Sequence, residues 1–210
     1  MIKQKTASDF LLFLRSWAAR PLEVAAIAPS SRRLAMAMTT EIGPFSGNVL
    51  ELGPGTGAFT RALLRKGVYE NNLILVERNP AFATLLRKRY PSATLIEGDA
   101  QHLSLPTVKS VGAAISGLPL LSMPAQTVQA ILSAIFHHLA EGASLFQFTY
   151  GPRCPISPQI LAGLGLEASF QRWVPLNLPP ASVYRISRSR PEAGAWGSPA
   201  SAPVIERGGA

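Results

Sequence analysis

A glycine-rich segment after a short apolar run holds the residues best suited to bind a ligand. Residues 49–57 read V-L-E-L-G-P-G-T-G, and an apolar period typical of a helix begins at Ala58. Glycines let the backbone approach a ligand closely, and the N-terminus of the following helix offers free N–H groups. The next apolar run, residues 73–77, ends in Glu77, whose carboxylate suits the two hydroxyls of a ribose. The pattern predicts a strand–turn–helix site for a ligand that contains a nucleoside.

Two cofactor classes share this plan, and the spacing of the glycines distinguishes them. A dinucleotide site requires G-x-G-x-x-G, whereas this chain has G-x-G-x-G with Ala58 in place of the last glycine. Glu51, at the strand end, would repel a pyrophosphate but attract the amino group of a methionine moiety. E-L-G-P-G-T-G resembles motif I of the class I S-adenosylmethionine-dependent methyltransferases, which implies S-adenosyl-L-methionine as the cofactor. A glycine turn without a ligand is the alternative. The residues assigned to the cofactor here are Glu51, Gly53, Gly55, Gly57 and Glu77.

The ends of the third and fourth apolar runs extend this cofactor site. Gly98-Asp99-Ala100 follows the third run. In class I methyltransferases an acidic residue here accepts a hydrogen bond from the adenine amino group, so the resemblance assigns Asp99 and Ala100 to the adenine. An ordinary strand-end turn capped by Asp99 is the alternative. Ser116, at the end of the fourth run, completes the cofactor set.

The acceptor of the methyl group is expected next to the end of the fourth run, which reads S-G-L-P-L from Ser116. Enzymes that methylate an exocyclic nucleobase nitrogen carry N-x-P-Y here, with an amide for the amine and an aromatic ring for the flipped base. Gly117 and Leu120 stand at those two positions. This departure argues against the adenine dimethyltransferases of ribosomal RNA. A plain structural turn is the alternative reading of Gly117 and Leu118, which we otherwise place beside the acceptor.

Tyr150, at the end of the fifth apolar run, is the third residue expected at the acceptor site. Its hydroxyl group would orient the amine, and its ring would favour a growing quaternary ammonium through cation–π attraction. A packing role is the alternative. An amine nucleophile needs no dedicated protein base, because desolvation in a pocket lowers the pKa of the ammonium group.

Across residues 8–188 the chain resembles the soluble bacterial phospholipid N-methyltransferases. The motifs behind this resemblance, besides the glycine segment, are P-S-S-R-R-L-A at 29–35, V-E-R-N at 76–79, S-G-L-P-L at 116–120, Q-F-T-Y-G-P at 147–152 and N-L-P-P-A-S-V-Y-R at 177–185. The resemblance implies methylation of phosphatidylethanolamine and its methylated forms, towards phosphatidylcholine. Arg153 or Arg185 would hold the lipid phosphate, although each on its own also fits a solvated surface. An RNA adenine or small-molecule methyltransferase is the runner-up.

Composition and charge agree with a single domain that meets an anionic partner. The chain has 210 residues, of which 47% are hydrophobic and 15% charged, and its net charge is +8. Its single cysteine, Cys154, excludes an intramolecular disulfide and fits a reducing compartment. The basic excess suits nucleic acid or an acidic membrane. The resemblance favours the membrane, so we expect no nucleic acid and no metal, and the oligomeric state stays open.

The first residues predict an amphipathic helix. Phe10, Phe13, Leu14 and Trp17 share one helical face at spacing i, i+3, i+4, i+7, and basic residues flank them. A basic helix with such a face can lie in a bilayer interface, although packing on the domain core is the alternative. Arg15 interrupts the apolar run, so we expect no signal peptide. The protein is therefore expected in the cytoplasm, peripherally associated with the inner face of the membrane.

The elements that position these residues alternate between strand and helix. Strands are predicted at 48–53, 73–77, 94–97, 111–116 and 143–150, and helices at 32–42, 58–67, 80–90 and 125–139. This alternation predicts an α/β class I methyltransferase (Rossmann-like) fold, a doubly wound sheet. Two final strands, 166–174 and 181–189, predict an antiparallel hairpin. Residues 1–21 form the predicted helix, 22–189 the methyltransferase domain and 190–210 a tail whose composition predicts disorder.

Overall fold

A computed structural model describes residues 28–106 and 110–189. The predicted amphipathic helix and the C-terminal tail lie outside this part of the chain. The membrane role of Phe10, Phe13, Leu14 and Trp17 therefore stays a prediction.

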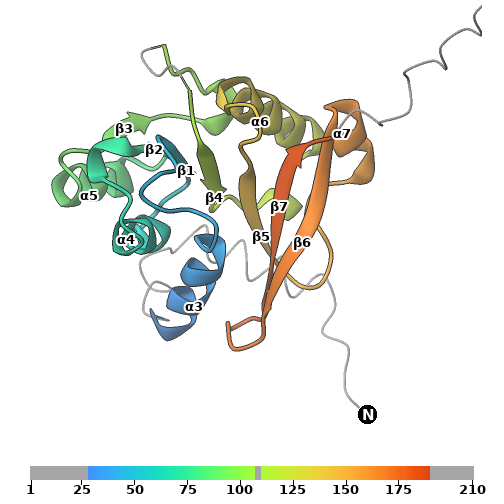
Figure 1. The fold of residues 1–210 in the computed structure, drawn as a ribbon, viewed down its shortest axis with the longest axis horizontal. Helices are drawn as coiled ribbons and strands as arrows, with labels where there is room; N and C mark the ends of the chain where they lie inside the picture. The colour runs from blue at the N-terminus through green and yellow to red at the C-terminus, as the bar shows by residue number, and fades with distance from the viewer. Residues whose placement is uncertain (1–27, 107–109, 190–210) are drawn as a thin grey trace, which may run out of the picture.

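A seven-stranded sheet in the order β3-β2-β1-β4-β5-β7-β6 forms the centre of the protein (Figure 1). Strands β1 to β5 pair in parallel, and β7 pairs antiparallel with both β5 and β6. The predicted fold, a mostly parallel doubly wound sheet with a C-terminal antiparallel hairpin, is confirmed. The strands are β1 (Val49–Leu52), β2 (Leu73–Glu77), β3 (Thr94–Glu97), β4 (Ala113–Ser116), β5 (Leu145–Tyr150), β6 (Leu166–Val174) and β7 (Ala181–Arg188).

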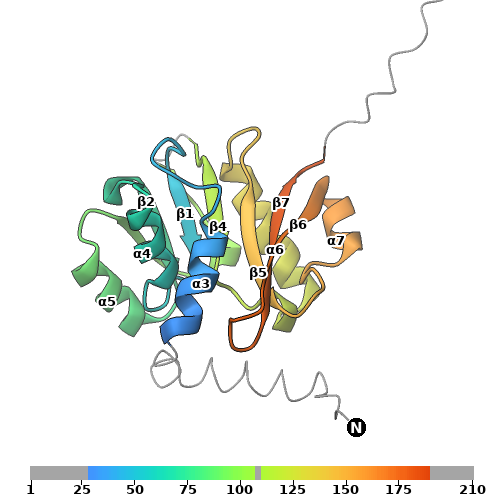
Figure 2. The ribbon, with the colours of Figure 1, turned by 60° about the horizontal axis from the view of Figure 1, so that its bottom comes forward.

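Helices cover both faces of the sheet (Figure 2). On one face, α3 (Ala28–Met38), α4 (Ala58–Arg65) and α5 (Pro80–Arg89) pack in one hydrophobic cluster. On the other, α6 (Ala125–His138) and α7 (Pro158–Gly163) pack in a second cluster. Strand β1 alternates between them, because Val49 belongs to the first cluster and Leu50 and Leu52 to the second. Burial on both faces explains why the central strands read as continuous apolar runs.

Several element boundaries differ from the sequence-based prediction. The helix expected at 32–42 is α3, which begins four residues earlier, at Ala28. Strand β4 begins at Ala113 rather than at 111, and Val111 forms only an isolated bridge with Leu139. Helix α7 was not predicted, although Ser157 caps it and Pro158 opens it. It has only six residues, too short for a clear apolar period. The cap of α5 by Asn79 is confirmed.

The sheet places its ligand cleft where its strand order reverses. The chain runs from β1 outward to β2 and β3, and then returns to β4 on the other side of β1. The connections that leave β1 and β4 lead to helices on opposite faces of the sheet, α4 and α6, so a crevice opens at this point. Three short 3-10 helices lie in the connections: η1 (Glu70–Asn72), η2 (Ala100–His102) and η3 (Leu120–Ser122). None of the described helices has the length and apolarity needed to cross a bilayer.

Candidate active site

The glycine loop between β1 and α4 owes its shape to three left-handed residues. Gly53, Gly55 and Gly57 have φ values of +64°, +54° and +79°. A Cβ atom on Gly53 would lie 2.8 Å from Leu118 Cδ2, and one on Gly57 would lie 2.9 Å from the Tyr90 hydroxyl oxygen. A Cβ atom on Gly55 would meet no atom within 4 Å. Packing against the Tyr90 ring and the left-handed backbone require glycine at 57, and the left-handed backbone favours it at 53, whereas Gly55 faces the space that a ligand can enter.

Glu51 lies beneath this loop as a fully buried carboxyl group. Its Oε2 accepts a hydrogen bond of 2.7 Å from the Thr60 hydroxyl, and its Oε1 has no partner among the described residues. Burial raises the pKa of Glu51 from 4.5 to about 7, against the opposing effect of the hydrogen bonds from Thr60. An unsatisfied buried carboxyl oxygen is costly, and a cationic or N–H donor within hydrogen-bond distance of it would lower that cost.

Glu77 connects the ends of β2 and of the glycine loop. Its Oε2 accepts from the Gly55 amide at 3.0 Å and its Oε1 from the Asn79 amide at 2.8 Å. These bonds fix the carboxylate at the cleft wall. Since a carboxylate has about four acceptor positions, it can still receive the two hydroxyls of a ribose.

Asp99 begins the turn after β3. Its Oδ1 accepts from the Gln101 amide at 2.9 Å, and its Oδ2 lies 3.5 Å from Arg78 NH1. The hydrogen bond from the Gln101 amide is the main cause that lowers the pKa of Asp99, so this side chain is an ionised acceptor at neutral pH. The backbone of Ala100, which opens η2, lies beside it on the cleft wall.

The loop after β4 packs directly on the glycine loop. The Gly117 amide donates to Leu52 O at 2.8 Å, and a Cβ atom on Gly117 would lie 2.7 Å from Gly53 O. Ser116, buried below, accepts from the Leu118 amide at 3.2 Å. The Gln147 side-chain amide donates to Leu118 O at 3.1 Å. Gly117 is therefore glycine because any side chain would separate the two loops.

Three aromatic rings form the wall on the β5 side of the cleft. Phe148 lies edge-on to Phe59 of α4 at 5.9 Å between ring centroids, and edge-on to Tyr150 at 5.3 Å. Burial raises the pKa of Tyr150, so its hydroxyl group stays protonated at neutral pH. Phe148 was missed in the sequence analysis, although its position two residues before Tyr150 in a strand places both on one face.

The cleft brings together most of the sequence-predicted site residues that lie in the described part of the chain. It is a cavity of about 1110 Å³ that α3 and the β6–β7 loop also border. Glu51, Gly57 and Ser116 are buried and do not line it. Glu51 and Ser116 belong to strands under the loops, and Gly57 packs against Tyr90. The predicted residues that line it are Gly53, Gly55, Glu77, Asp99, Ala100, Gly117, Leu118 and Tyr150.

One of the two arginines predicted to hold the lipid phosphate, Arg185, lies away from the cleft. Arg185 pairs in register with Phe146, towards the opposite end of β5 from the cleft. Its side chain donates to Ser144 Oγ at 2.8 Å and lies 3.7 Å from Glu41. Arg153 is exposed in the turn after β5, outside the cavity lining, and its contact with a lipid phosphate stays a prediction. The prediction for Arg185 was wrong because the residue pattern of an antiparallel strand does not tell which of its ends lies beside the site.

These observations together define a class I methyltransferase. The open space above Gly55 and the carboxylates at the ends of β2 and β3 fit the ribose and adenine parts of S-adenosyl-L-methionine. The orphaned Glu51 Oε1, under the glycine loop, is the acceptor predicted for the amino group. No cluster of His, Cys, Asp or Glu that could hold a metal ion occurs in residues 28–106 and 110–189.

Comparisons with known proteins place the chain within a family. Residues 49–142 match the methyltransferase domain family. The chain is 30% identical over 185 residues to an ornithine lipid N-methyltransferase of Singulisphaera acidiphila, an alignment that covers 84% of this chain and 94% of that protein. It is 35% identical over 99 residues to ribosomal RNA small subunit methyltransferase A of Chlorobium chlorochromatii, covering 47% of this chain but 34% of that protein.

Solved structures agree on the fold. A glycopeptide N-methyltransferase in complex with S-adenosyl-L-methionine superposes with a TM-score of 0.61 at 16% identity, over 77% of this chain and 95% of that chain. The protein belongs to the same family as the ornithine lipid N-methyltransferase, within the S-adenosylmethionine-dependent methyltransferases. S-adenosyl-L-methionine is its cofactor.

Proposed function

We propose that this protein methylates the amine headgroup of a membrane lipid. Phosphatidylethanolamine and its methylated forms are the substrates that the sequence resemblance implies, and the ornithine lipid is the one that the name of the Singulisphaera relative suggests. The observation that carries the proposal is the aromatic wall of the cleft. It lines the same cavity as the Gly117 loop, beside which we expect the methyl acceptor.

The aromatic wall suits an amine that gains methyl groups. The faces of aromatic rings attract alkylammonium ions, and the attraction persists when every N–H has been replaced by a methyl group. A site built from hydrogen-bond acceptors alone would lose contacts at each methyl transfer. Phe59, Phe148 and Tyr150 therefore fit a headgroup that ends as a tertiary or quaternary ammonium.

The residues at the acceptor site bind and orient rather than remove a proton. The bound cofactor supplies an electrophilic methyl group. The substrate amine would lose its ammonium proton to solvent, and its lone pair would then accept that methyl group while the sulfonium becomes a neutral thioether. Tyr150, kept protonated by burial, offers its oxygen to an amine N–H. Desolvation by the apolar side chain of Leu118 lowers the pKa of the amine and favours the uncharged nucleophile, whereas the aromatic rings bind the methylated, cationic product.

The geometry of Gly117 disfavours a nucleobase as the acceptor. The amide side chain that base methyltransferases use at this position would place a Cβ atom 2.7 Å from the Gly53 carbonyl oxygen. The match to the ribosomal RNA enzyme covers only 34% of that protein. RNA is accordingly the second acceptor class to be tested.

Methyl transfer from radiolabelled S-adenosylmethionine tests the proposal. One vesicle preparation contains phosphatidylethanolamine, a second contains ornithine lipid, both include an anionic lipid, and a third reaction contains RNA in place of vesicles. We expect labelled lipid in at least one vesicle arm, with the headgroup identified by chromatography. Label in RNA alone would refute the proposal.

A matched pair of glutamate variants controls for cofactor use. Glu77 and Glu97 are register partners on adjacent strands, but only Glu77 lines the cleft. Glu97 is paired with Arg87 at 3.4 Å on the surface. We expect Glu77→Ala to abolish labelling and Glu97→Ala to retain it.

A further inference from the structure

The loop between β6 and β7 reverses the usual placement of polar and apolar side chains. Leu176 and Leu178 are 65% and 71% exposed, while Asn177 between them is 4% exposed. The Asn177 side-chain amide donates to Pro179 O at 2.7 Å, and its backbone amide to Val174 O at 3.2 Å. These bonds hold the asparagine inward, so the two leucines project from the loop. Large apolar side chains held outward together mark an interaction site.

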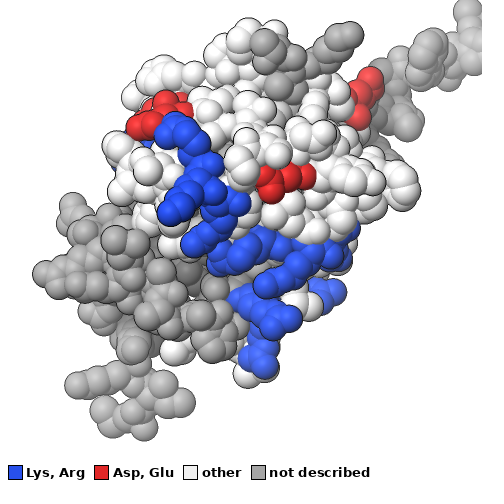
Figure 3. All heavy atoms as spheres, turned by 90° about the vertical axis from the view of Figure 1, so that its left-hand side faces the viewer, with Lys and Arg blue, Asp and Glu red and all other residues white. Residues whose placement is uncertain are grey.

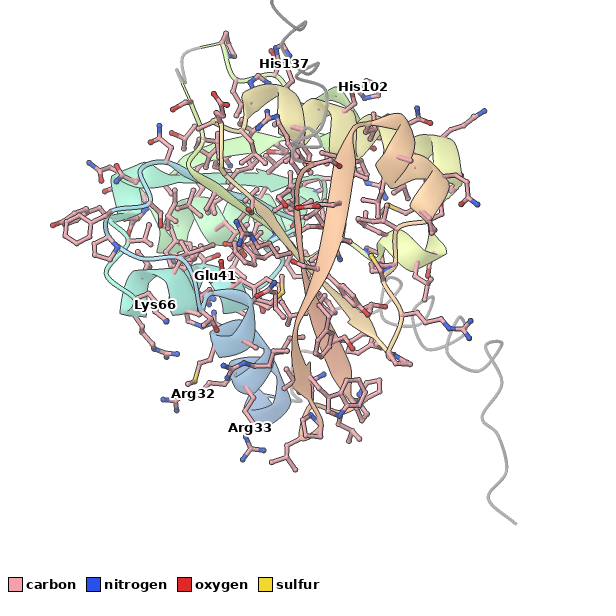
Figure 4. All side chains as sticks on the ribbon, turned by 45° about the vertical axis from the view of Figure 1, so that its right-hand side comes forward. Arg32, Arg33, Glu41, Lys66, His102 and His137 are labelled. Carbon is pink, nitrogen blue, oxygen red and sulfur yellow. The ribbon has the colours of Figure 1, made fainter. Side chains whose placement is uncertain are left out.

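The first turns of α3 stand beside this loop. Helix α3 contacts both β6 and β7, and its residues Arg32 and Met36 line the cleft together with Asn177 and Leu178. Figure 4 shows Arg32 and Arg33 pointing away from the body of the protein, at the end of α3 that lies near the loop. The loop and the helix therefore border one mouth of the cleft.

The charges on this rim are uncompensated within the described part of the chain. Arg32 and Arg33 are exposed, and neither forms an ion pair with a residue in 28–106 or 110–189. Exposed leucines next to free guanidinium groups match a lipid interface, where apolar side chains enter the acyl boundary and cations bind phosphates. A protein partner would be expected to supply carboxylates to the arginines instead.

We propose that Leu176, Leu178, Arg32 and Arg33 form a membrane-docking rim. The leucines insert below the headgroups, the arginines bind lipid phosphate, and the mouth of the cleft is thereby set against the membrane surface. The proposal rests on the proposed function for the identity of the partner. It names a docking element separate from the predicted N-terminal helix.

Vesicle binding by the full chain tests the rim directly. Flotation with vesicles of phosphatidylcholine and phosphatidylglycerol compares the parent with the double variant Leu176→Asp/Leu178→Asp. The control is Phe45→Asp, because Phe45 is fully exposed and precedes β1, at the end of the sheet opposite the cleft. We expect the double variant to lose roughly ten- to a hundredfold in vesicle affinity. We expect Phe45→Asp to bind as the parent does, and melting temperatures verify that each variant folds.

Three results would overturn the proposal. In the first, the double variant binds vesicles as tightly as the parent does. In the second, Phe45→Asp loses as much vesicle affinity as the double variant. In the third, the double variant changes only the oligomeric state in size-exclusion chromatography, so that a second copy covers the leucines. If vesicles bind through the rim but no lipid is methylated, the proposed function fails and the docking rim stands. If lipid is methylated but the rim variants do not change vesicle binding, the docking rim fails and the proposed function stands.

A second measurement remains informative if the aspartate variants fold poorly. A fluorophore is placed by Leu178→Cys in a Cys154→Ser background and compared with the same label at Phe45→Cys. Brominated lipids quench a probe that enters the acyl region. We expect strong quenching at 178 and none at 45; equal quenching at both positions would refute insertion of the loop.

Discussion

The ionisation of Glu51 is governed by burial rather than by a charged partner. The residue belongs to β1, it is completely buried, and one of its carboxyl oxygens has no partner among the described residues. Its raised pKa means that the folded protein holds a proton which the unfolded chain releases. Between pH 4.5 and about 7 the folded state therefore binds more protons, and folding stability attributable to this group falls as pH rises through that window.

Substitution of Glu51 isolates this effect. We expect the free energy of unfolding of Glu51→Gln, minus that of the parent, to become more favourable as pH rises from 5 to 8, because the amide has no charge to bury. Urea titrations at several pH values measure both free energies of unfolding. In their difference, the contributions of the other titrating groups cancel. A difference that stays constant with pH would show that Glu51 is already ionised in the folded protein.

Two substitutions of Tyr150 distinguish the contribution of its aromatic ring to substrate binding from that of its hydroxyl group. If the ring attracts the ammonium, Tyr150→Phe retains most of kcat/KM for the lipid substrate, whereas Tyr150→Leu loses roughly 3- to 30-fold, in line with a cation–π contribution of about 0.5–2 kcal/mol. Initial rates of radiolabelled methyl transfer measure both variants. Equal losses in the two variants would mean that the hydroxyl group carries the interaction.

At the scale of elements, the site depends on two loops that fit only through glycine. The loops after β1 and β4 meet where Gly117 approaches Gly53 O, and Gln147 of β5 holds the neighbouring Leu118 carbonyl. The loop that we expect at the acceptor site is thus also packed directly against the glycine loop. Function and packing constrain the same residue.

Alanine at position 117 tests this double constraint. We expect Gly117→Ala to destabilise the fold by roughly 1–3 kcal/mol, because the new Cβ atom meets a backbone carbonyl that must shift. Calorimetry gives the change in Tm. The control is Gly163→Ala in α7, where a Cβ atom meets nothing within 4 Å and stability should stay unchanged or rise slightly. Similar melting temperatures for both variants would contradict the close contact.

At the scale of the whole molecule, basic residues gather on one side. Figure 3 shows a band of Lys and Arg side chains on the face formed by α3, α4 and α5. The exposed cations on these elements and at the C-cap of α4 are Arg32, Arg33, Arg65, Lys66, Arg87, Lys88 and Arg89. Clustered charge of one sign creates a field that attracts an anionic surface and orients the molecule towards it.

The salt dependence of vesicle binding distinguishes the contribution of this field from that of the apolar contacts of the docking rim. We expect raising NaCl from about 0.05 to about 0.5 M to weaken binding to anionic vesicles, since the Debye length contracts to a few ångström. The parent should keep a residual salt-resistant binding, and Leu176→Asp/Leu178→Asp should keep almost none. Flotation at increasing salt measures this, and a salt-independent affinity in both proteins would argue against an electrostatic contribution.

Much of the fold and the cofactor half of the site followed from the sequence by itself. The glycine spacing, Glu77 and Asp99 are local patterns, each fixed by a strand end and the turn after it, so their positions follow from chain order. Strand–helix alternation likewise determined a parallel sheet with its ligand at the carboxyl ends. The tertiary structure decided the remainder, because it depends on contacts between residues distant in the chain. Only packing showed that Arg185 points away from the cleft, that Gly117 meets Gly53, and that Asn177 is buried while Leu176 and Leu178 are exposed.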